Sequence, residues 1–135
     1  MEIQIAVLCD AATEFAGKIN LLGAFDTINS PQMPASVPSC SIALRLMFEK
    51  IEEGAHKLRL GVVDEDGKLL INPVDFPLDI RVPEDAGFVA RNLVINFQGL
   101  HFPKPGRYSV DLALDGRHER SIPLVVRQVS APVPG

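Results

Sequence analysis

Apolar and polar residues alternate with a period of two along most of this chain. The clearest run is 40–50, in which Ser41, Arg45 and Glu49 fall on one side of a strand and large apolar residues fall on the other. Alternation of this kind is typical of a strand with one buried face. We therefore predict that this strand points these residues into a core: Ile42, Leu44, Leu46 and Phe48.

Similar runs predict about eight strands, separated by turns rich in glycine, proline and aspartate. Gly23 predicts a bulge within its strand, and Pro77 predicts that its strand is an edge strand or a broken one. Asp10 caps at most one helical turn, over 10–16, which is too short to be stable alone. The other predicted segments are strands 2–9, 19–28, 56–64, 68–71, 76–82 and 88–98, a proline-rich connector 29–39 that crosses between sheets, and a short connection 100–104.

A succession of strands without helices predicts an all-β fold. We expect an antiparallel two-sheet sandwich of the immunoglobulin-like or Greek-key kind. At 135 residues the chain has a length that suits one domain. We assign residues 1–130 to a single β-sandwich domain and residues 131–135 to a flexible C-terminal tail.

A hairpin is predicted around Asp115–Gly116, which lies between two alternating runs. A two-residue turn there would pair Leu114 with Arg117 and turn the apolar residues of the second strand toward solvent. A three-residue loop with a bulge at its glycine pairs Tyr108 with Ile122 and keeps both apolar faces inward. We prefer the bulged loop, which predicts these inward residues: Tyr108, Val110, Leu112, Ile122 and Leu124.

Pro105-Gly106-Arg107-Tyr108 opens the first strand of this hairpin. A tyrosine at this position resembles the tyrosine corner of immunoglobulin-like sandwiches, in which the hydroxyl bonds to nearby backbone. The chain has no tryptophan, and neither of its cysteines lies in the strand that follows Tyr108. An antibody-type domain is therefore excluded.

Three segments carry glycines, turn aspartates and core aromatic residues: Ala11–Asp26, Pro105–Tyr108 and Leu114–Gly116. The first segment includes the run Gly17-Lys18-Ile19-Asn20-Leu21-Leu22-Gly23. Together they resemble a family of small bacterial proteins of unknown function, over nearly the whole chain. The resemblance implies a stand-alone bacterial β-sandwich. It implies no activity, cofactor or catalytic residue.

Composition narrows the possible partners. The formal net charge is -4, and nucleic-acid binding is not expected because it depends on clustered lysine and arginine. The only small basic group is Arg117, His118 and Arg120. The chain has no apolar run of about 18 residues and no signal-peptide pattern, so we predict a cytoplasmic protein without membrane insertion. In that compartment Cys9 and Cys40 are expected to be buried, reduced thiols.

No pattern of residues predicts an enzyme, a cofactor or a strong metal site. The three histidines lie in separate connections without the spacing of metal ligands. Asp64 and Asp66 are weak candidates for a calcium site, which Asp10 or Asp26 could join if loop carboxylates gather at one end of the sandwich. A hairpin turn explains the pair Asp64 and Asp66 more simply.

The polar side of strand 88–98 is the least ordinary surface feature. Asn92, Asn96 and Gln98 form an uncharged amide stripe that suits hydrogen bonding to a sugar, a peptide or a second copy of the chain. The simpler interpretation is the solvated side of an antiparallel sheet. Some apolar residues on nominally outer faces need cover, which a symmetric dimer would supply: Leu8, Met47, Val63 and Val125.

These observations favour a non-enzymatic β-sandwich module that acts by binding, with a homo-oligomer as the expected assembly and another protein as a possible partner. The alternative is a calcium- or lipid-dependent binding domain with loop carboxylates at one end of the sandwich. A third hypothesis, an enzyme, requires a deep pocket that holds polar groups with perturbed pKa values.

Overall fold

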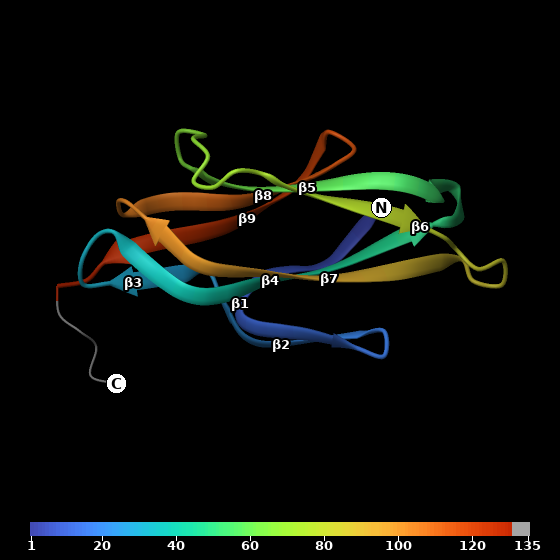
Figure 1. Ribbon diagram of the computed structural model, residues 1–135, viewed down its shortest axis with the longest axis horizontal. Coiled ribbons are helices and arrows are strands. Elements are labelled where there is room, and N and C mark those ends of the chain that lie inside the picture. The colour runs from blue at the N-terminus through green and yellow to red at the C-terminus, as the bar shows by residue number, and fades with distance from the viewer. Residues whose placement is uncertain (131–135) are drawn as a thin grey trace.

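The computed structural model describes residues 1–130, which form nine strands and one 3-10 turn in a two-layer sandwich (Figure 1). Sheet A has the strand order β2-β1-β4-β7, and sheet B has the order β3-β9-β8-β5-β6. The elements are β1 (Glu2–Phe15), β2 (Lys18–Phe25), β3 (Thr27–Ser30), β4 (Ala35–Glu49), η1 (Lys50–Glu52), β5 (Gly54–Asp64), β6 (Val74–Ile80), β7 (Phe88–Phe102), β8 (Gly106–Leu114) and β9 (Arg117–Gln128). The predicted all-β sandwich is confirmed, with nine strands in place of about eight. The predicted tail, 131–135, lies outside the described residues.

The core fills the space between the two sheets. The four residues predicted to point inward from β4 are fully buried, and all five predicted inward residues of the β8–β9 hairpin are buried as well. Both sheets therefore present an apolar side to each other, which is how a sandwich excludes water from its interior. The largest fully buried side chains are Phe48, Phe102, Ile42, Leu44, Leu46, Leu58, Leu60, Ile80, Leu112, Val62, Val110 and Val126.

The β8–β9 hairpin has a two-residue turn, so the predicted three-residue bulged loop is wrong. Leu114 pairs with Arg117 across Asp115–Gly116. Asp115 and Gly116 have φ angles of 53° and 81°, as a type I′ turn requires. This turn matches the right-handed twist of the two strands that it joins.

A bulge at Glu119 explains how the apolar faces still point inward. The register shifts next to the turn, so that Leu112 pairs with Arg120. The extra residue reverses the alternation of β9 and returns its apolar residues to the core. Tyr108 consequently pairs with Leu124, not with Ile122 as predicted.

β1 and β2 form a hairpin where one helical turn was predicted over 10–16. Phe15 pairs with Lys18 across Ala16–Gly17, whose φ angles of 54° and 76° again define a type I′ turn. The helical prediction is wrong because pairing with β2 supplies hydrogen-bond partners for this backbone, which one isolated helical turn cannot do well.

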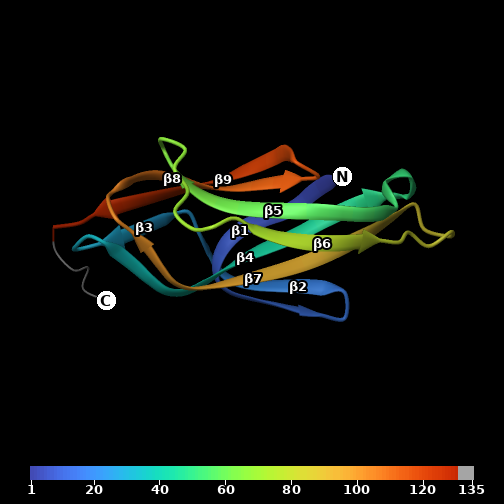
Figure 2. The ribbon, with the colours of Figure 1, turned by 45° about the horizontal axis from the view of Figure 1, so that its top comes forward.

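The distal half of this hairpin folds back beneath sheet A. Residues 2–9 of β1 pair with β4, whereas residues 11–15 pair with β2 alone. Figures 1 and 2 show the hairpin reversing direction and running under the outer face of sheet A. We call residues 10–24 the β1–β2 arm.

Gly23 lies at the bend of the arm. The predicted bulge there is wrong, because the register continues unchanged from Cys9↔Ala24 to Ala11↔Leu22. Gly23 has a φ of 68°, and the Asp10 carboxylate occupies the space that a Cβ would need. A glycine is therefore required by both the backbone angle and the close approach.

The predicted strand 19–28 is divided between the two sheets. β2 ends at Phe25, and β3 joins sheet B, where it pairs in parallel with β9. The chain then returns to sheet A, so the predicted crossing between sheets is confirmed. The connector is much shorter than the predicted 29–39, because β4 already begins at Ala35.

Sheet B and the end of sheet A differ from prediction at two places. Residues 68–71 form one isolated bridge, Val63 with Leu69, instead of a strand, and β5 pairs with β6. β6 is the edge strand predicted from Pro77. β7 runs through the predicted connection at 100–104 as far as Phe102, because it pairs with β4 over its whole length.

The predicted tyrosine-corner hydrogen bond is present. The Tyr108 hydroxyl donates to the Lys104 carbonyl at 2.7 Å. Its ring packs edge-on against Phe102, with ring centroids 4.9 Å apart. Tyr108 therefore ties the start of β8 to the chain that enters it.

We expect Gly23→Ala to destabilise the protein more than Gly17→Ala. Both alanines would adopt a positive φ, which costs about 1–2 kcal/mol, but only at Gly23 does the new methyl overlap the Asp10 carboxylate. Urea unfolding should show a further loss of about 1–2 kcal/mol for Gly23→Ala. Adding Asp10→Ala should recover part of that loss, and equal losses for the two glycines would contradict this account.

Candidate functional site

The β1–β2 arm covers the middle of the outer face of sheet A. Ser41 and Ala43 lie on the side of β4 that points away from the sandwich core, yet both are buried. Cys9 of β1 is buried on the same side. The arm residues that alternate toward the sheet are half-buried: Ala12, Ile19 and Leu21. Arm and sheet therefore enclose a second, thinner apolar layer.

Arg45 and Asn92 fix the tip of the arm to the sheet. The Gly17 carbonyl accepts hydrogen bonds from Arg45 Nη1 at 3.2 Å and from Asn92 Nδ2 at 3.1 Å. Arg45 Nη1 also donates to Asn92 Oδ1 at 2.8 Å, and Arg45 Nε donates to Gln4 Oε1 at 2.9 Å. This network holds the folded-back position of the arm.

The three residues of the predicted amide stripe make different contacts. All three amides lie on the outer side of sheet A, as the alternation of β7 predicts. Asn92 holds the arm, and Asn96 accepts a hydrogen bond of 2.6 Å from the Ser41 hydroxyl. Gln98 is exposed beyond the arm. Two of the three amides thus have structural partners, and the stripe as a ligand surface stays a prediction.

The side of the arm that faces solvent exposes two large apolar residues. Phe15 is 77% exposed and Leu22 is 73% exposed. β2 is also one of the two edge strands of sheet A, so one row of its backbone groups faces outward without a neighbouring strand among the described residues. Exposed apolar side chains beside an open strand edge are typical of a surface that pairs with another chain.

The four residues predicted to need cover on outer faces have different surroundings. Leu8 belongs to the core and was placed wrongly, because a bulge between Ile3 and Ile5 reverses the alternation of β1. The other three are half-buried: Met47, Val63 and Val125.

Asp64 and Asp66 lie in the turn after β5, and the Asp64 carboxylate is engaged there. Asp64 Oδ1 accepts hydrogen bonds from the backbone N–H groups of Asp66 and Lys68, both at 2.9 Å. Asp66 lies 3.9 Å from the ammonium of Lys104. Within residues 1–130, no three histidine, cysteine, aspartate or glutamate side chains gather closely enough to hold a metal ion. The calcium hypothesis therefore gains no support from these contacts and stays a prediction.

His56 joins three elements at the η1 end of the sandwich. Its Nδ1 lies 2.6 Å from Asp115 Oδ2, and its Nε2 lies 2.6 Å from the Glu52 carbonyl oxygen. Asp115 Oδ1 accepts a hydrogen bond from Lys57 N at 2.9 Å. The bond to the Glu52 carbonyl and then the bond to Asp115 raise the pKa of His56, and His56 in turn lowers the pKa of Asp115.

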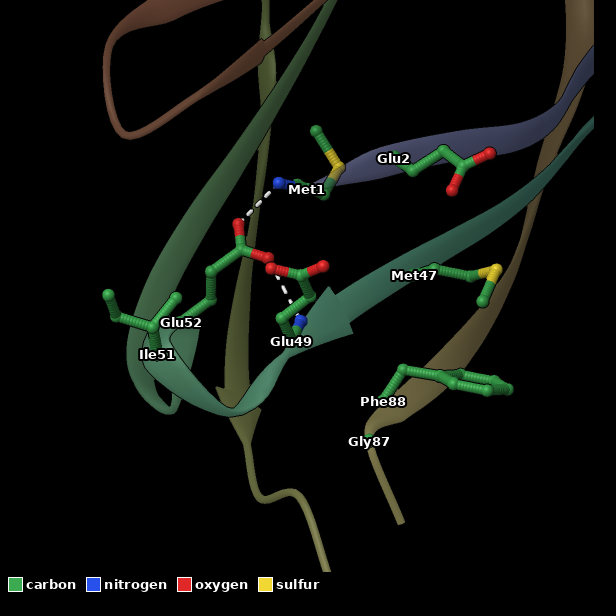
Figure 3. Close-up of a pocket in the computed structure, with 8 residues that line it drawn as sticks. All are labelled: Met1, Glu2, Met47, Glu49, Ile51, Glu52, Gly87 and Phe88. Carbon is green, nitrogen blue, oxygen red and sulfur yellow. Dashed lines mark hydrogen bonds and ion pairs between the residues drawn. The ribbon is translucent and has the colours of Figure 1, made fainter.

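A pocket of about 580 Å³ lies close to this network (Figure 3). It forms where the beginning of β1, the end of β4, η1 and the beginning of β7 meet. The side chains of Glu2, Met47 and Phe88 point to the same side in Figure 3. These three belong to the outer face of sheet A, since Glu2 pairs with Met47 and Phe88 pairs with Glu49.

Cys9 and Cys40 are free thiols, and both are buried. Burial raises the pKa of each thiol, and the charge of Asp10 raises the pKa of both further. A thiol with a raised pKa is a poor nucleophile. The prediction of buried, reduced cysteines agrees with this geometry.

Sequence reasoning found part of this site. It identified Asn92 by its alternation but missed the Arg45–Asn92–Gly17 contact and the His56–Asp115 pair. The only local signal for either was Asp115–Gly116, which indicated a turn and not the partner of its carboxylate. Among residues 1–130, the structure shows no helix with the length and apolarity needed to cross a bilayer.

The fold and these surfaces define an all-β sandwich protein with a folded-back β1–β2 arm. Residues 4–127 match the model of a family of unknown function (DUF6941), and the chain belongs to that family. The predicted likeness to a family of unknown function is confirmed, while a bacterial origin stays a prediction. A search of curated proteins finds no match to this chain. What the protein does is therefore argued from its surfaces.

We expect Arg45→Ala to loosen the arm without unfolding the sandwich. The substitution removes the donor that joins Gln4, Asn92 and Gly17, and an unsupported two-stranded hairpin is only marginally stable. Hydrogen exchange of the arm amides should become about tenfold faster, while the amides of β4 and β8 keep their protection. Arg59→Ala is the matched control, because Arg59 pairs with Asp75 in sheet B. Unchanged exchange in the arm would show that Arg45 does not hold it.

We expect the stability contributed by His56 to decrease as pH rises. The folded pKa of His56 is raised, so its contribution is complete below the unfolded value of about 6.5 and is lost as pH rises through the folded pKa. The free energy of unfolding, from urea titrations between about pH 5.5 and about pH 8.5, should fall more steeply in the native protein than in His56→Gln. His118→Gln is the control and should keep the native slope. Identical slopes for native and His56→Gln proteins would refute the assignment.

Proposed function

We propose that this protein is a non-enzymatic β-sandwich module that acts by binding, and that its first partner is a second copy of the same chain. The observation that carries the proposal is the β1–β2 arm, which presents Phe15 and Leu22 to solvent beside an open strand edge. Exposing these apolar side chains to water is unfavourable in free energy. Association with a second copy would bury them and remove that cost.

The edge of β2 suits pairing with an identical edge. Natural sheet edges usually discourage such pairing with prolines, inward charges or a covering loop. β2 has no proline, and its only charged residue is Lys18 at its beginning. By contrast, β6 at the edge of sheet B contains Pro77 and two aspartates, Asp75 and Asp79. The edge of β2 is therefore less protected against pairing than the edge of β6.

Symmetry supports a second copy as the partner. The middle of β2 falls between Leu21 and Leu22. Antiparallel pairing of two β2 strands about a two-fold axis at Leu22, next to this point, sets Leu22 of one copy directly opposite Leu22 of the other on the same face of the sheet. Each copy then covers the apolar side chain that the other exposes, and sheet A becomes continuous across the dimer.

The proposal includes an immunoglobulin-like class for the sandwich and a cytoplasmic location. The tyrosine-corner bond from Tyr108 to Lys104 supports the first. The two buried free thiols support the second, because reduced cysteines are the usual state in the cytoplasm.

We expect the native protein to be a dimer at micromolar concentration and Leu22→Asp to weaken that dimer. A carboxylate at the centre of the paired edges would face its own copy across the axis, where like charges destabilise pairing. Sedimentation equilibrium should show a dissociation constant raised by about tenfold or more.

Leu69→Asp is the matched control. Leu69 is also an exposed leucine, but it lies in the loop after β5, far in sequence from the arm. This variant should keep the native dissociation constant. A native protein that stays monomeric throughout the micromolar range, or equal effects of the two substitutions, would overturn the proposed self-association.

A further inference from the structure

The pocket beside η1 has the size of a ligand site and an uncommon mixture of surfaces. Its volume of about 580 Å³ falls within the usual range for pockets that hold small molecules or side chains of a partner. No residue of the arm contributes to its lining. Binding here is consequently independent of the self-association proposed above.

The floor and one wall of the pocket are apolar and accessible. Met47 lies on the outer face of sheet A, and Phe88, 52% exposed, stands diagonally across from it on β7. Ile51 of η1 is 90% exposed at the opposite side of the pocket. Methionine adapts its shape to different partners, and a phenylalanine ring offers a face on which a cation can rest.

The rim of the pocket carries an excess of negative charge. Glu2, Glu49 and Glu52 line it together with the amino group of Met1. The ammonium of Met1 forms an ion pair with Glu52. In the part of the chain that the structure describes, neither Glu2 nor Glu49 has a cation at ion-pair distance.

The nearest lysine in the sequence does not neutralise this charge. The ammonium of Lys50 lies 3.1 Å from Glu53 and 3.3 Å from Glu84, and it also donates to the Val82 carbonyl at 3.1 Å. These groups hold Lys50 away from the lining residues. Three carboxylates and one ammonium leave two negative charges uncompensated beside an apolar floor.

We propose that this pocket binds an arginine side chain of a partner protein segment in which apolar residues flank the arginine. The aliphatic stem and the flanking residues pack on Met47 and Phe88. The guanidinium group lies over the Phe88 ring and donates hydrogen bonds to the carboxylates of Glu2 and Glu49. Arginine fits better than lysine, because its planar group stacks on aromatic rings and forms paired bonds to carboxylates.

The arrangement of the strands explains why these contacts can occur together. Glu2 lies directly opposite Met47, and Glu49 lies directly opposite Phe88. The Glu2 carboxylate is thus next to Met47 on one face of the sheet. The Glu49 carboxylate instead turns toward η1, where it accepts the Glu52 backbone N–H, and borders the pocket from that side (Figure 3). A ligand with a positive charge at the end of an apolar stem can contact both the apolar surface and the carboxylates. A purely apolar ligand would bury the carboxylates without partners.

The test compares two acetylated and amidated pentapeptides, Ala-Leu-Arg-Leu-Ala and Ala-Leu-Gln-Leu-Ala, titrated into the full chain and followed by NMR. The arginine peptide should shift the amide signals of residues 47–52 and 87–90 and bind about tenfold more tightly than the glutamine peptide. Its affinity should fall as salt rises from about 0.05 M to about 0.5 M.

Variants of the pocket separate charge from apolar contact. Glu2→Gln with Glu49→Gln should weaken the arginine peptide by about tenfold and leave the glutamine peptide unchanged. Glu65→Gln with Glu119→Gln removes the same two charges elsewhere and should have no effect beyond a small general one. Phe88→Ala should weaken both peptides. Glu2→Gln alone keeps the test valid if changing Glu49 disturbs η1.

Three results would overturn the proposal. The first is no shift of the pocket signals at millimolar arginine peptide. The second is equal affinity for the two peptides in the native protein. The third is methylguanidinium, which carries the guanidinium group without a peptide, binding as tightly as the arginine peptide; the occupant would then be a small guanidinium compound and not a protein segment.

Discussion

The hydrogen bonds that Arg45 and Asn92 donate to the Gly17 carbonyl are the contacts on which the outer half of this molecule depends. They hold the β1–β2 arm against sheet A, and the arm keeps water from Ser41, Ala43 and Cys9. The middle of β4 is consequently enclosed on both sides, by the sandwich core and by the arm. Because the arm is turned inward on one side, its other side must display Phe15 and Leu22. The same constraint thus creates both the second apolar layer and the exposed surface.

Charged and apolar side chains are distributed differently over the two surfaces proposed to bind partners, the edge of the arm and the pocket beside η1. β2, the outer strand of the arm, has one charged residue, Lys18, and offers backbone groups along its edge, which suits pairing with a strand. The pocket beside η1 is small, acidic and partly apolar, which suits one side chain. The His56–Asp115 pair lies at the η1 end of the sandwich and joins β5 to the β8–β9 turn. It stabilises the end of the sandwich where the pocket forms and leaves the arm untouched.

Local patterns predicted the core well, because alternation decides which residues of a strand point inward whatever the strand pairs with. β4 and the β8–β9 hairpin show this: their inward residues were right even though the turn and the bulge were not. No local sequence pattern indicates the bulge at Glu119. The bulge is required because the two-residue turn alone would point the apolar residues of β9 away from the core. The arm was missed for the same reason. Its fold-back depends on Arg45 and Asn92, which are far from Gly17 in the sequence, and the pocket depends on four segments that meet only in three dimensions.

β3 pairs in parallel with β9, although residues 31–116 lie between them. During synthesis from the N-terminus, β3 leaves the ribosome long before the strand that completes its hydrogen bonds. Closing so long a loop is entropically unfavourable, and pairings of this kind slow folding. Sheet A can assemble once β7 has emerged, whereas sheet B must wait for the final strand. Completion of the sandwich is therefore a late step of folding, and the chain passes through an interval in which the apolar side of sheet A has no cover.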